Sequence, residues 1–221
     1  MRYEWMDEYL LSKRSVTRDL QPEWNWIRYK LGDRMFAAIL LDDNDVPVYI
    51  NVKLDPVEGS MLREQYADII PGYYSDKRCW NSVMPDGAVP DELLKRLLDE
   101  SYRLVLAGMS KKRQREVLGM ACCGADCGVC ALNGKLCTGC NAACGKVFHA
   151  PEGKACPIYA CAVNRRRYAT CGECPDMPCG IWRATRDPNL SDEAFESSIR
   201  ERSDRLRSIY AREGKAGEHG V

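Results

Sequence analysis

Residues 35–54 read MFAAILLDDNDVPVYINVKL, and this stretch decides the fold class of the first half of the chain. The apolar run from Met35 to Leu41 is followed by a polar turn, and every second residue from Val46 to Leu54 is aliphatic. A period of two is typical of a strand that buries one face. Two such segments joined by a short polar turn predict a β-hairpin.

Helices and further strands are predicted on both sides of this hairpin by their periodicity. A helix opens at Asp55, which suits the N-cap, with Pro56 at the first helical position and Glu58 completing a capping box. The predicted order is a helix from Met6 that stops before Val16, a strand over 24–31, the hairpin, the helix opening at Asp55, a strand over 79–83, and a helix over 90–107 ending at Gly108. We therefore predict an α+β domain over residues 1–119, with a small antiparallel sheet and flanking helices.

Several stretches of this half resemble the MmcQ/YjbR family. They are residues 32–37, 52–56, 71–81 and 94–108, in the order and spacing of that family. The resemblance implies a curved antiparallel sheet with flanking helices, described for the family as a double-wing DNA-binding fold similar to that of frataxin-like proteins. The chain departs from the family pattern at Asp76 and Cys79, where the family more often shows Asn and His.

Nucleic-acid contact is expected only locally, because 32 basic and 32 acidic residues leave no net charge. Cations next to aromatic side chains can hold phosphates and stack bases. The candidate residues are Lys53, Lys77, Arg78, Tyr73 and Trp80, together with Lys111, Lys112 and Arg113 of a basic run. The alternative is that the aromatic side chains pack the sheet and the cations are solvated.

Thirteen cysteines are the strongest signal in the sequence, because twelve of them fall between Cys122 and Cys179. This change of composition predicts a cysteine-rich metal-binding domain over 120–185 and a C-terminal helix and tail over 186–221. The helix is expected from Ser191, a suitable N-cap, to Glu213. The predicted fold is thus the α+β domain, then a metal-stabilised cysteine-rich domain, then a C-terminal helix.

Metal binding is predicted because the cysteines form three C-x-x-C pairs, each with an internal glycine. Thiolates must converge at about 2.3 Å from one zinc ion, and a tight turn lets two neighbouring cysteines do so. Disulfides fit poorly with this spacing and with a cytoplasmic protein. The predicted ligands are Cys123, Cys127, Cys130, Cys137, Cys140, Cys144, Cys156, Cys161, Cys171, Cys174, Cys179 and His149, enough for two or three zinc ions. The alternative cofactor is an iron–sulfur cluster, which also uses four cysteines.

The cysteine-rich segment resembles an uncharacterised prokaryotic domain-of-unknown-function family. It opens with C-G-x-x-C-x-x-C at Cys123 and closes with C-x-E-C-P-x-x-P-C at Cys179. The resemblance implies metal binding and no more specific function. The additional Cys122 and the position of Cys144 depart from the pattern and leave the grouping of the ligands open.

Two functions follow from these features. The first is a binding or regulatory protein with structural zinc, in contact with nucleic acid or with another protein. The second is a redox or metal-sensing protein that carries an iron–sulfur cluster or reactive thiolates. An enzyme is less favoured, because neither half pairs a nucleophile with a base. No membrane partner is expected, and a cytoplasmic location is predicted, since the run 35–41 is too short to span a bilayer and residues 1–10 are charged.

Overall fold

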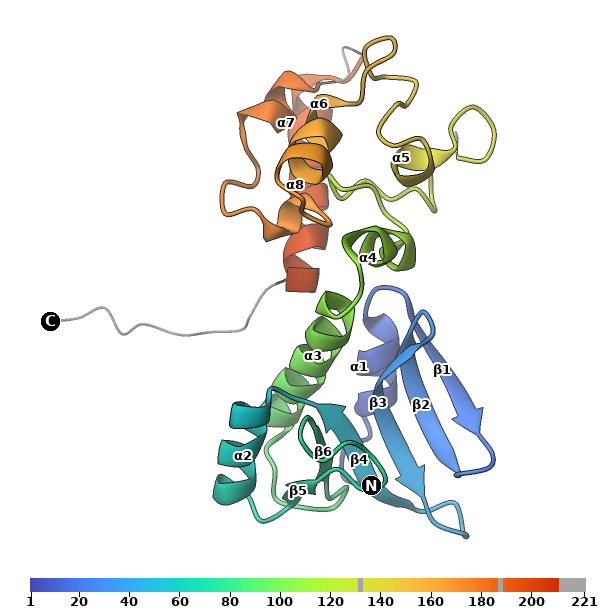
Figure 1. Cartoon of the computed structure of the whole chain (residues 1–221), viewed down its shortest axis with the longest axis vertical. Coiled ribbons are helices and arrows are strands. Elements are labelled where there is room, and N and C mark those ends of the chain that lie inside the picture. Colours follow the sequence, from blue (N-terminus) through green and yellow to red (C-terminus); the bar gives the residue numbers. More distant parts are fainter. Residues whose placement is uncertain (131–132, 187–188, 211–221) are drawn as a thin grey trace, which may run out of the picture. The chain divides into compact units, whose positions relative to one another are not determined.

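The computed structural model describes residues 1–130, 133–186 and 189–210 (Figure 1). The chain forms two compact units, of which the first covers Met1–Gly108 and the second begins at Met109. This division falls before the predicted boundary at 119. Helix α4 (Lys111–Leu118) and helix α8 (Asp192–Tyr210) both belong to the second unit.

The first unit is built on a six-stranded antiparallel sheet with the order β1-β2-β3-β4-β6-β5 (Figure 1). The predicted hairpin is confirmed, because β3 pairs with β4 and places Ile39 opposite Ile50. The strands are β1 (Val16–Gln21), β2 (Trp26–Leu31), β3 (Arg34–Leu41), β4 (Pro47–Lys53), β5 (Ile69–Pro71) and β6 (Trp80–Val83). The expected α+β sheet with flanking helices is therefore present.

Two of these strands, β1 and β5, were absent from the predicted order. Both are edge strands of the sheet. No residue of β1 is fully buried, so its sequence lacks the aliphatic alternation that marks β4. Strand β5 is only three residues long. The hydrophobic pattern of such edge strands in the sequence is weak. The prediction therefore did not include β1 and β5.

The three predicted helices of the first unit are α1 (Met6–Ser12), α2 (Pro56–Gln65) and α3 (Asp91–Ala107). Asp55 caps α2 as expected, because its side chain accepts hydrogen bonds from the backbone N–H groups of Val57 and Glu58. The predicted capping box is wrong. The Glu58 carboxylate instead forms an ion pair with Arg96 of α3 at 2.6 Å, which joins the two helices.

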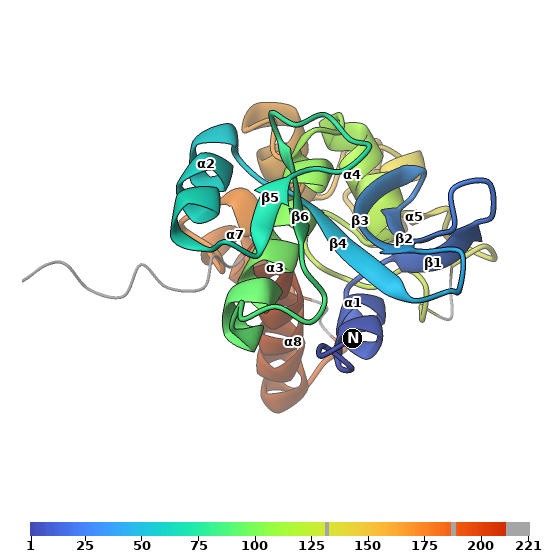
Figure 2. The same ribbon diagram turned by 90° about the horizontal axis from the view of Figure 1, so that it is seen from below.

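The core of the first unit lies between the sheet and the helices α1 and α3, which are on the same side of the sheet (Figure 2). A β-bulge in β3, opposite Tyr29 and Lys30, adds Phe36 to the buried side chains. The Phe36 ring packs edge-on against Tyr102 of α3, with 5.5 Å between the ring centroids. The bulge thus helps to anchor α3 on the sheet.

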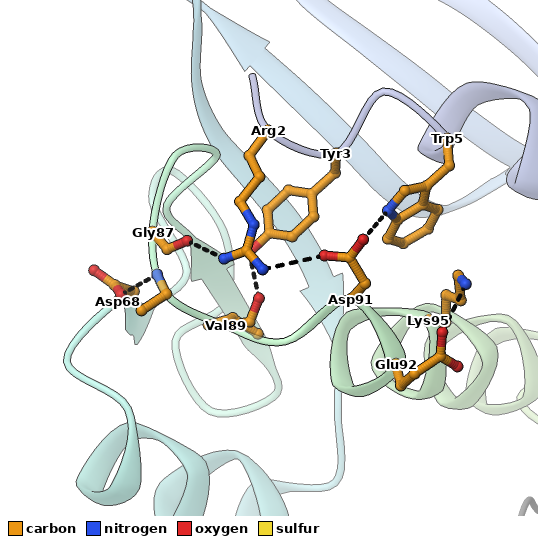
Figure 3. A network of polar contacts seen from close by, with 10 residues as sticks. Arg2, Tyr3, Trp5, Asp68, Gly87, Val89, Asp91, Glu92 and Lys95 are labelled. Atoms are coloured by element: carbon orange, nitrogen blue, oxygen red, sulfur yellow. Dashed lines mark hydrogen bonds and ion pairs between the residues drawn. The ribbon is translucent and has the colours of Figure 1, made fainter.

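The segment that precedes α1 is fastened to the loop before α3 by three side chains (Figure 3). The Arg2 guanidinium donates to the Gly87 carbonyl at 2.8 Å, and the hydroxyl of the fully buried Tyr3 donates to the Val89 carbonyl at 2.8 Å. The Trp5 indole N–H donates to the Asp91 carboxylate at 2.9 Å. These hydrogen bonds hold the N-terminal segment against the rest of the first unit.

The second unit consists of short helices and one long helix, α8, and within its described residues no named strand is found. They are α4, α5 (Gly139–Ala142), α6 (Pro157–Tyr159), the π-helical turn η1 (Ala160–Arg165), the 3-10 turn η2 (Cys171–Glu173), α7 (Gly180–Ala184) and α8. The predicted C-terminal helix is confirmed as far as Tyr210, and Ser191 caps it by accepting from the Ala194 N–H at 3.2 Å. Residues 211–213 of that prediction lie outside the described residues.

An apolar core also forms in the second unit. Trp182 and Leu206 are fully buried in it, together with Phe195, Ile199 and Ile209 of α8. Much of this core therefore comes from outside the 120–185 segment, which on its own has few large apolar side chains. No helix in the described parts of the chain is long and apolar enough to cross a membrane.

Candidate functional site

All twelve cysteines of the second unit lie in described positions, and each is a free thiol. Eleven of them line one of two cavities, which we name the small cavity and the wide cavity. Cys144 lines neither cavity, although it was among the predicted ligands. Cys122 lines the wide cavity, although it was not among them.

The small cavity brings together four thiols from three short elements. Cys161 comes from η1, Cys171 and Cys174 from η2 and its end, and Cys179 from the N-cap of α7. The volume of this cavity is about 30 Å³, more than the roughly 10–15 Å³ that one water molecule needs, so a single ion fits in it.

Two of these sulfurs already receive hydrogen bonds. An N–H group of Arg165 donates to Cys161 Sγ at 3.2 Å, and the Trp182 indole N–H donates to Cys171 Sγ. Burial raises the pKa of the Cys171 thiol to about 12, while the Trp182 bond lowers it. A thiol with such a pKa is protonated at neutral pH unless a cation replaces the proton. Hydrogen-bond donors aimed at sulfur are typical of sites with thiolate metal ligands.

The wide cavity has a volume of about 590 Å³. It is lined by Cys122, Cys123, Cys127, Cys130, Cys137, Cys140 and Cys156, and by His149 among other residues. The His149 ring is exposed and packs edge-on against Phe148, with 5.1 Å between the centroids. The predicted ligand His149 thus lines the wide cavity with an exposed ring.

The turn from Cys137 to Cys140 presents its sulfurs and its N–H groups to the wide cavity. Gly139 has φ +84, a conformation that favours glycine, and its N–H donates to Cys137 Sγ at 3.3 Å. The backbone N–H of Cys140 donates to Cys127 Sγ. Burial raises the pKa of the Cys140 thiol to about 12, and Cys123 and Cys127 raise it further. These thiols therefore crowd one another.

Throughout the described parts of the chain, no three Cys, His, Asp or Glu side chains converge closely enough to hold an ion as they stand. In the small cavity, four thiols nevertheless line one space of about 30 Å³. Cys171 and Cys122 connect the two cavities, since the Cys171 N–H donates to the Cys122 carbonyl at 2.8 Å. The thiol chemistry of the second unit is thus concentrated in one continuous region.

The predicted nucleic-acid residues of the first unit are only partly assembled. Tyr73 packs against Tyr49 and Tyr74, with centroid distances of 4.9 and 4.4 Å, and Tyr74 is 80% exposed. Lys77 lines the open hollow beside these rings, which has a volume of about 730 Å³. Arg78, in contrast, is paired with Asp76 at 2.8 Å.

Two buried side chains fix the position of Tyr73. The Tyr73 N–H donates to the Ser82 hydroxyl at 2.8 Å, and its carbonyl accepts from the Asn51 amide at 3.1 Å. Tyr74 has φ +50, which is unusual for a bulky residue and accompanies functional loops. The positive φ of Tyr74 could not be predicted from the sequence.

The remaining predicted residues lie elsewhere. Lys53 and Trp80 pair across β4 and β6, and both are half-buried. Lys111 forms an ion pair with Glu173, and Lys112 and Arg113 lie 3.8 and 3.7 Å from the Glu116 carboxylate. The basic run is therefore the start of helix α4, and its first three cations have carboxylate partners.

The sequence profile of the YjbR family matches residues 11–104. The uncharacterized protein YbdF of Escherichia coli O157:H7 is 34% identical to this chain over 89 residues, which are 40% of this chain and 71% of YbdF. The chain belongs to the YjbR family. The uncharacterized protein YjbR of Escherichia coli K12 is 25% identical over 108 residues, or 49% of this chain and 90% of YjbR.

A crystal structure of protein DR2400 of Deinococcus radiodurans, described by the domain name DUF419, is similar to this chain with a TM-score of 0.46 and 28% identity. The similarity covers 52% of this chain and 86% of DR2400. The profile match at 11–104 confirms the expected resemblance of the first half to YjbR. The resemblance of residues 123–182 to a cysteine-rich family stays a prediction.

Proposed function

We propose that this YjbR-family protein is a binding protein whose second unit is a zinc module. The small cavity carries the proposal, because it gathers Cys161, Cys171, Cys174 and Cys179 around a space of about 30 Å³. Four cysteine ligands are a common set for structural zinc. The zinc site would link η1, η2 and α7, which have few regular backbone bonds to one another.

The chemistry of the donor set supports zinc at this position. Zinc would take the place of the thiol protons and supply the positive charge that stabilises four buried thiolates. The N–H groups of Arg165 and Trp182 would remain on the sulfurs of Cys161 and Cys171 and hold them in orientation. Binding requires the sulfurs to move closer together, because no three ligands converge as they stand in the described residues.

The test is the zinc content of the full-length protein, purified without oxygen, for the wild type, Cys174→Ser and Cys144→Ser. Cys144→Ser is the matched control, because Cys144 is exposed and lines neither cavity. We expect Cys174→Ser to lose one zinc per chain and the control to lose none. Equal zinc content in the wild type and in Cys174→Ser would overturn the proposal.

A second candidate function is contact with single-stranded nucleic acid at the loop 71–77. It is favoured by the exposed Tyr74 ring, which stands beside the anchored Tyr73 and Lys77. Stacking on one aromatic side chain contributes about 1–3 kcal/mol per base. Tyr74→Ala should therefore weaken the binding of a single-stranded oligonucleotide at least about 5-fold. Trp24→Ala removes another exposed aromatic side chain and should have little effect, whereas equal effects or no binding at low salt would reject this function.

A further inference from the structure

We infer that the wide cavity takes an iron–sulfur cluster, and that the second unit therefore has two chemically different metal sites. The inference rests on the proposed zinc module and assigns a cofactor to its other thiol set. It is carried by the contrast between the cavities, about 590 Å³ for the wide cavity and 30 Å³ for the small one. Thiols spread around the larger space cannot all reach one ion by turning about their side-chain bonds.

Four of the thiols that line the wide cavity interact electrostatically with one another. The electrostatic neighbours of Cys140 include Cys123, Cys127 and Cys137, and those of Cys127 include Cys123 and Cys137. Iron–sulfur clusters are held by four cysteines that are shared among two or four irons. Cys123, Cys127, Cys137 and Cys140, which we name the inner set, supply that number of ligands.

Hydrogen bonds to these sulfurs are already in place. The Gly139 N–H donates to Cys137 Sγ, and the Cys140 N–H donates to Cys127 Sγ. Backbone N–H groups of this kind stabilise negative charge on cluster ligands and set the reduction potential. Both donors belong to the turn whose conformation depends on Gly139 at φ +84.

Helix α8 brings positive charge toward the same thiols. Arg202 lines the wide cavity, and its guanidinium lies 4.7 Å from the centroid of the Trp182 ring. Arg205 donates to the Gly124 carbonyl at 2.6 Å, in the loop between Cys123 and Cys127. Within the described residues, neither arginine has a carboxylate partner, so both charges are available to balance thiolates.

Binding of the cluster needs no oxidation of the protein. The four thiols release four protons to solvent, and four sulfur–iron bonds form. Cys122, Cys130 and Cys156 also line the cavity and remain as thiols. Ferric iron and sulfide come from outside the chain.

The experiment measures iron, acid-labile sulfide and zinc per full-length chain after anaerobic reconstitution with ferric iron and sulfide, together with the visible spectrum. Cys140→Ser changes the inner set, Cys174→Ser changes the small cavity, and Cys144→Ser is the control. We chose Cys140 because Cys123 is also an electrostatic neighbour of Cys171 in the small cavity. The wild type and Cys144→Ser should be coloured and contain equal numbers of iron and sulfide, with one zinc.

The variants separate this inference from the zinc proposal. Cys140→Ser should lose iron, sulfide and colour but keep its zinc, and Cys174→Ser should do the opposite. A colourless wild type with zinc at both sites would overturn the cluster and leave the zinc module standing. A wild type without either metal would overturn both. If Cys140→Ser does not fold, the test uses the wild-type spectrum and Cys127→Ser. This second variant should also lose iron, sulfide and colour but keep its zinc.

Discussion

Asp19 shows how a single residue of the first unit is stabilised across two strands. It lies in β1 directly opposite Arg28 of β2, and its carboxylate accepts from the Arg28 Nε and Nη2 at 2.9 Å each. The Lys30 ammonium lies 2.6 Å from the same carboxylate. Hydrogen bonds from Arg28 and then from Lys30 lower the pKa of Asp19 to about 2.

Asp19→Asn tests this interaction through its dependence on pH. Because the pKa of Asp19 is lower in the folded protein than its ordinary value of 3.8, its stabilisation is present above that value and is lost as the pH falls toward 2. We expect the variant to be less stable by about 0.5–1 kcal/mol near neutral pH, a range suited to a partly exposed pair. Urea unfolding midpoints of both proteins should converge near pH 2. A difference that stays constant over this range would contradict the account.

Residue roles were predictable where they depend on nearby sequence. Asp55 was identified as a helix cap because its partners are two and three residues away. The Asp19 pairing was not, because it requires the register of β1, which the sequence did not reveal. Glu58 was misassigned for the same reason, since its partner Arg96 lies 38 residues farther along the chain.

At the scale of elements, α8 is held against η2 by a close contact at Gly172. A Cβ atom placed on Gly172 would overlap the Tyr210 ring and would lie 3.3 Å from the Leu206 Cβ. Both partners belong to α8, which carries much of the apolar core of the second unit. The contact therefore couples the element that bears Cys171 to the longest helix of the unit.

Gly172→Ala should destabilise the second unit by about 1–3 kcal/mol, the usual cost of overpacking a close contact. Gly180→Ala is the matched control, because a Cβ on Gly180 would meet nothing within 4 Å. Thermal unfolding of the zinc-loaded proteins followed by circular dichroism measures the difference. Unchanged stability of Gly172→Ala would show that α8 does not pack tightly on η2.

Elements of the first unit were predicted well where one face is buried. The hairpin of β3 and β4 and the helix α3 have regular apolar periods, and their bounds agree with the prediction closely. The second unit could not be predicted in this way. Its cysteines were recognised by spacing, but their division between two cavities depends on how η1, η2 and α7 pack, which spacing alone does not determine.

At the scale of the whole molecule, the chain joins a YjbR domain to a second unit with its own core and its own thiols. The first unit buries a continuous apolar layer between sheet and helices, and its only cysteine is Cys79. The proposed zinc module predicts that metal stabilises the second unit alone. The two units should respond differently when metal is withdrawn.

Removal of zinc by a chelator tests this difference. Amide hydrogen exchange should become faster in residues 156–186, which surround the small cavity, and should stay unchanged in β3, β4 and α3. Re-addition of zinc should restore the original protection. Faster exchange throughout both units would contradict the separate dependence on metal.

The most direct measurement is the X-ray absorption spectrum of zinc bound to the full-length protein. The account predicts one class of zinc surrounded by four sulfur atoms at about 2.3 Å. This coordination should disappear in Cys174→Ser and persist in Cys144→Ser. Protein that binds no zinc, or zinc bound by oxygen and nitrogen only, would contradict the central claim that the four thiols of the small cavity form a metal site.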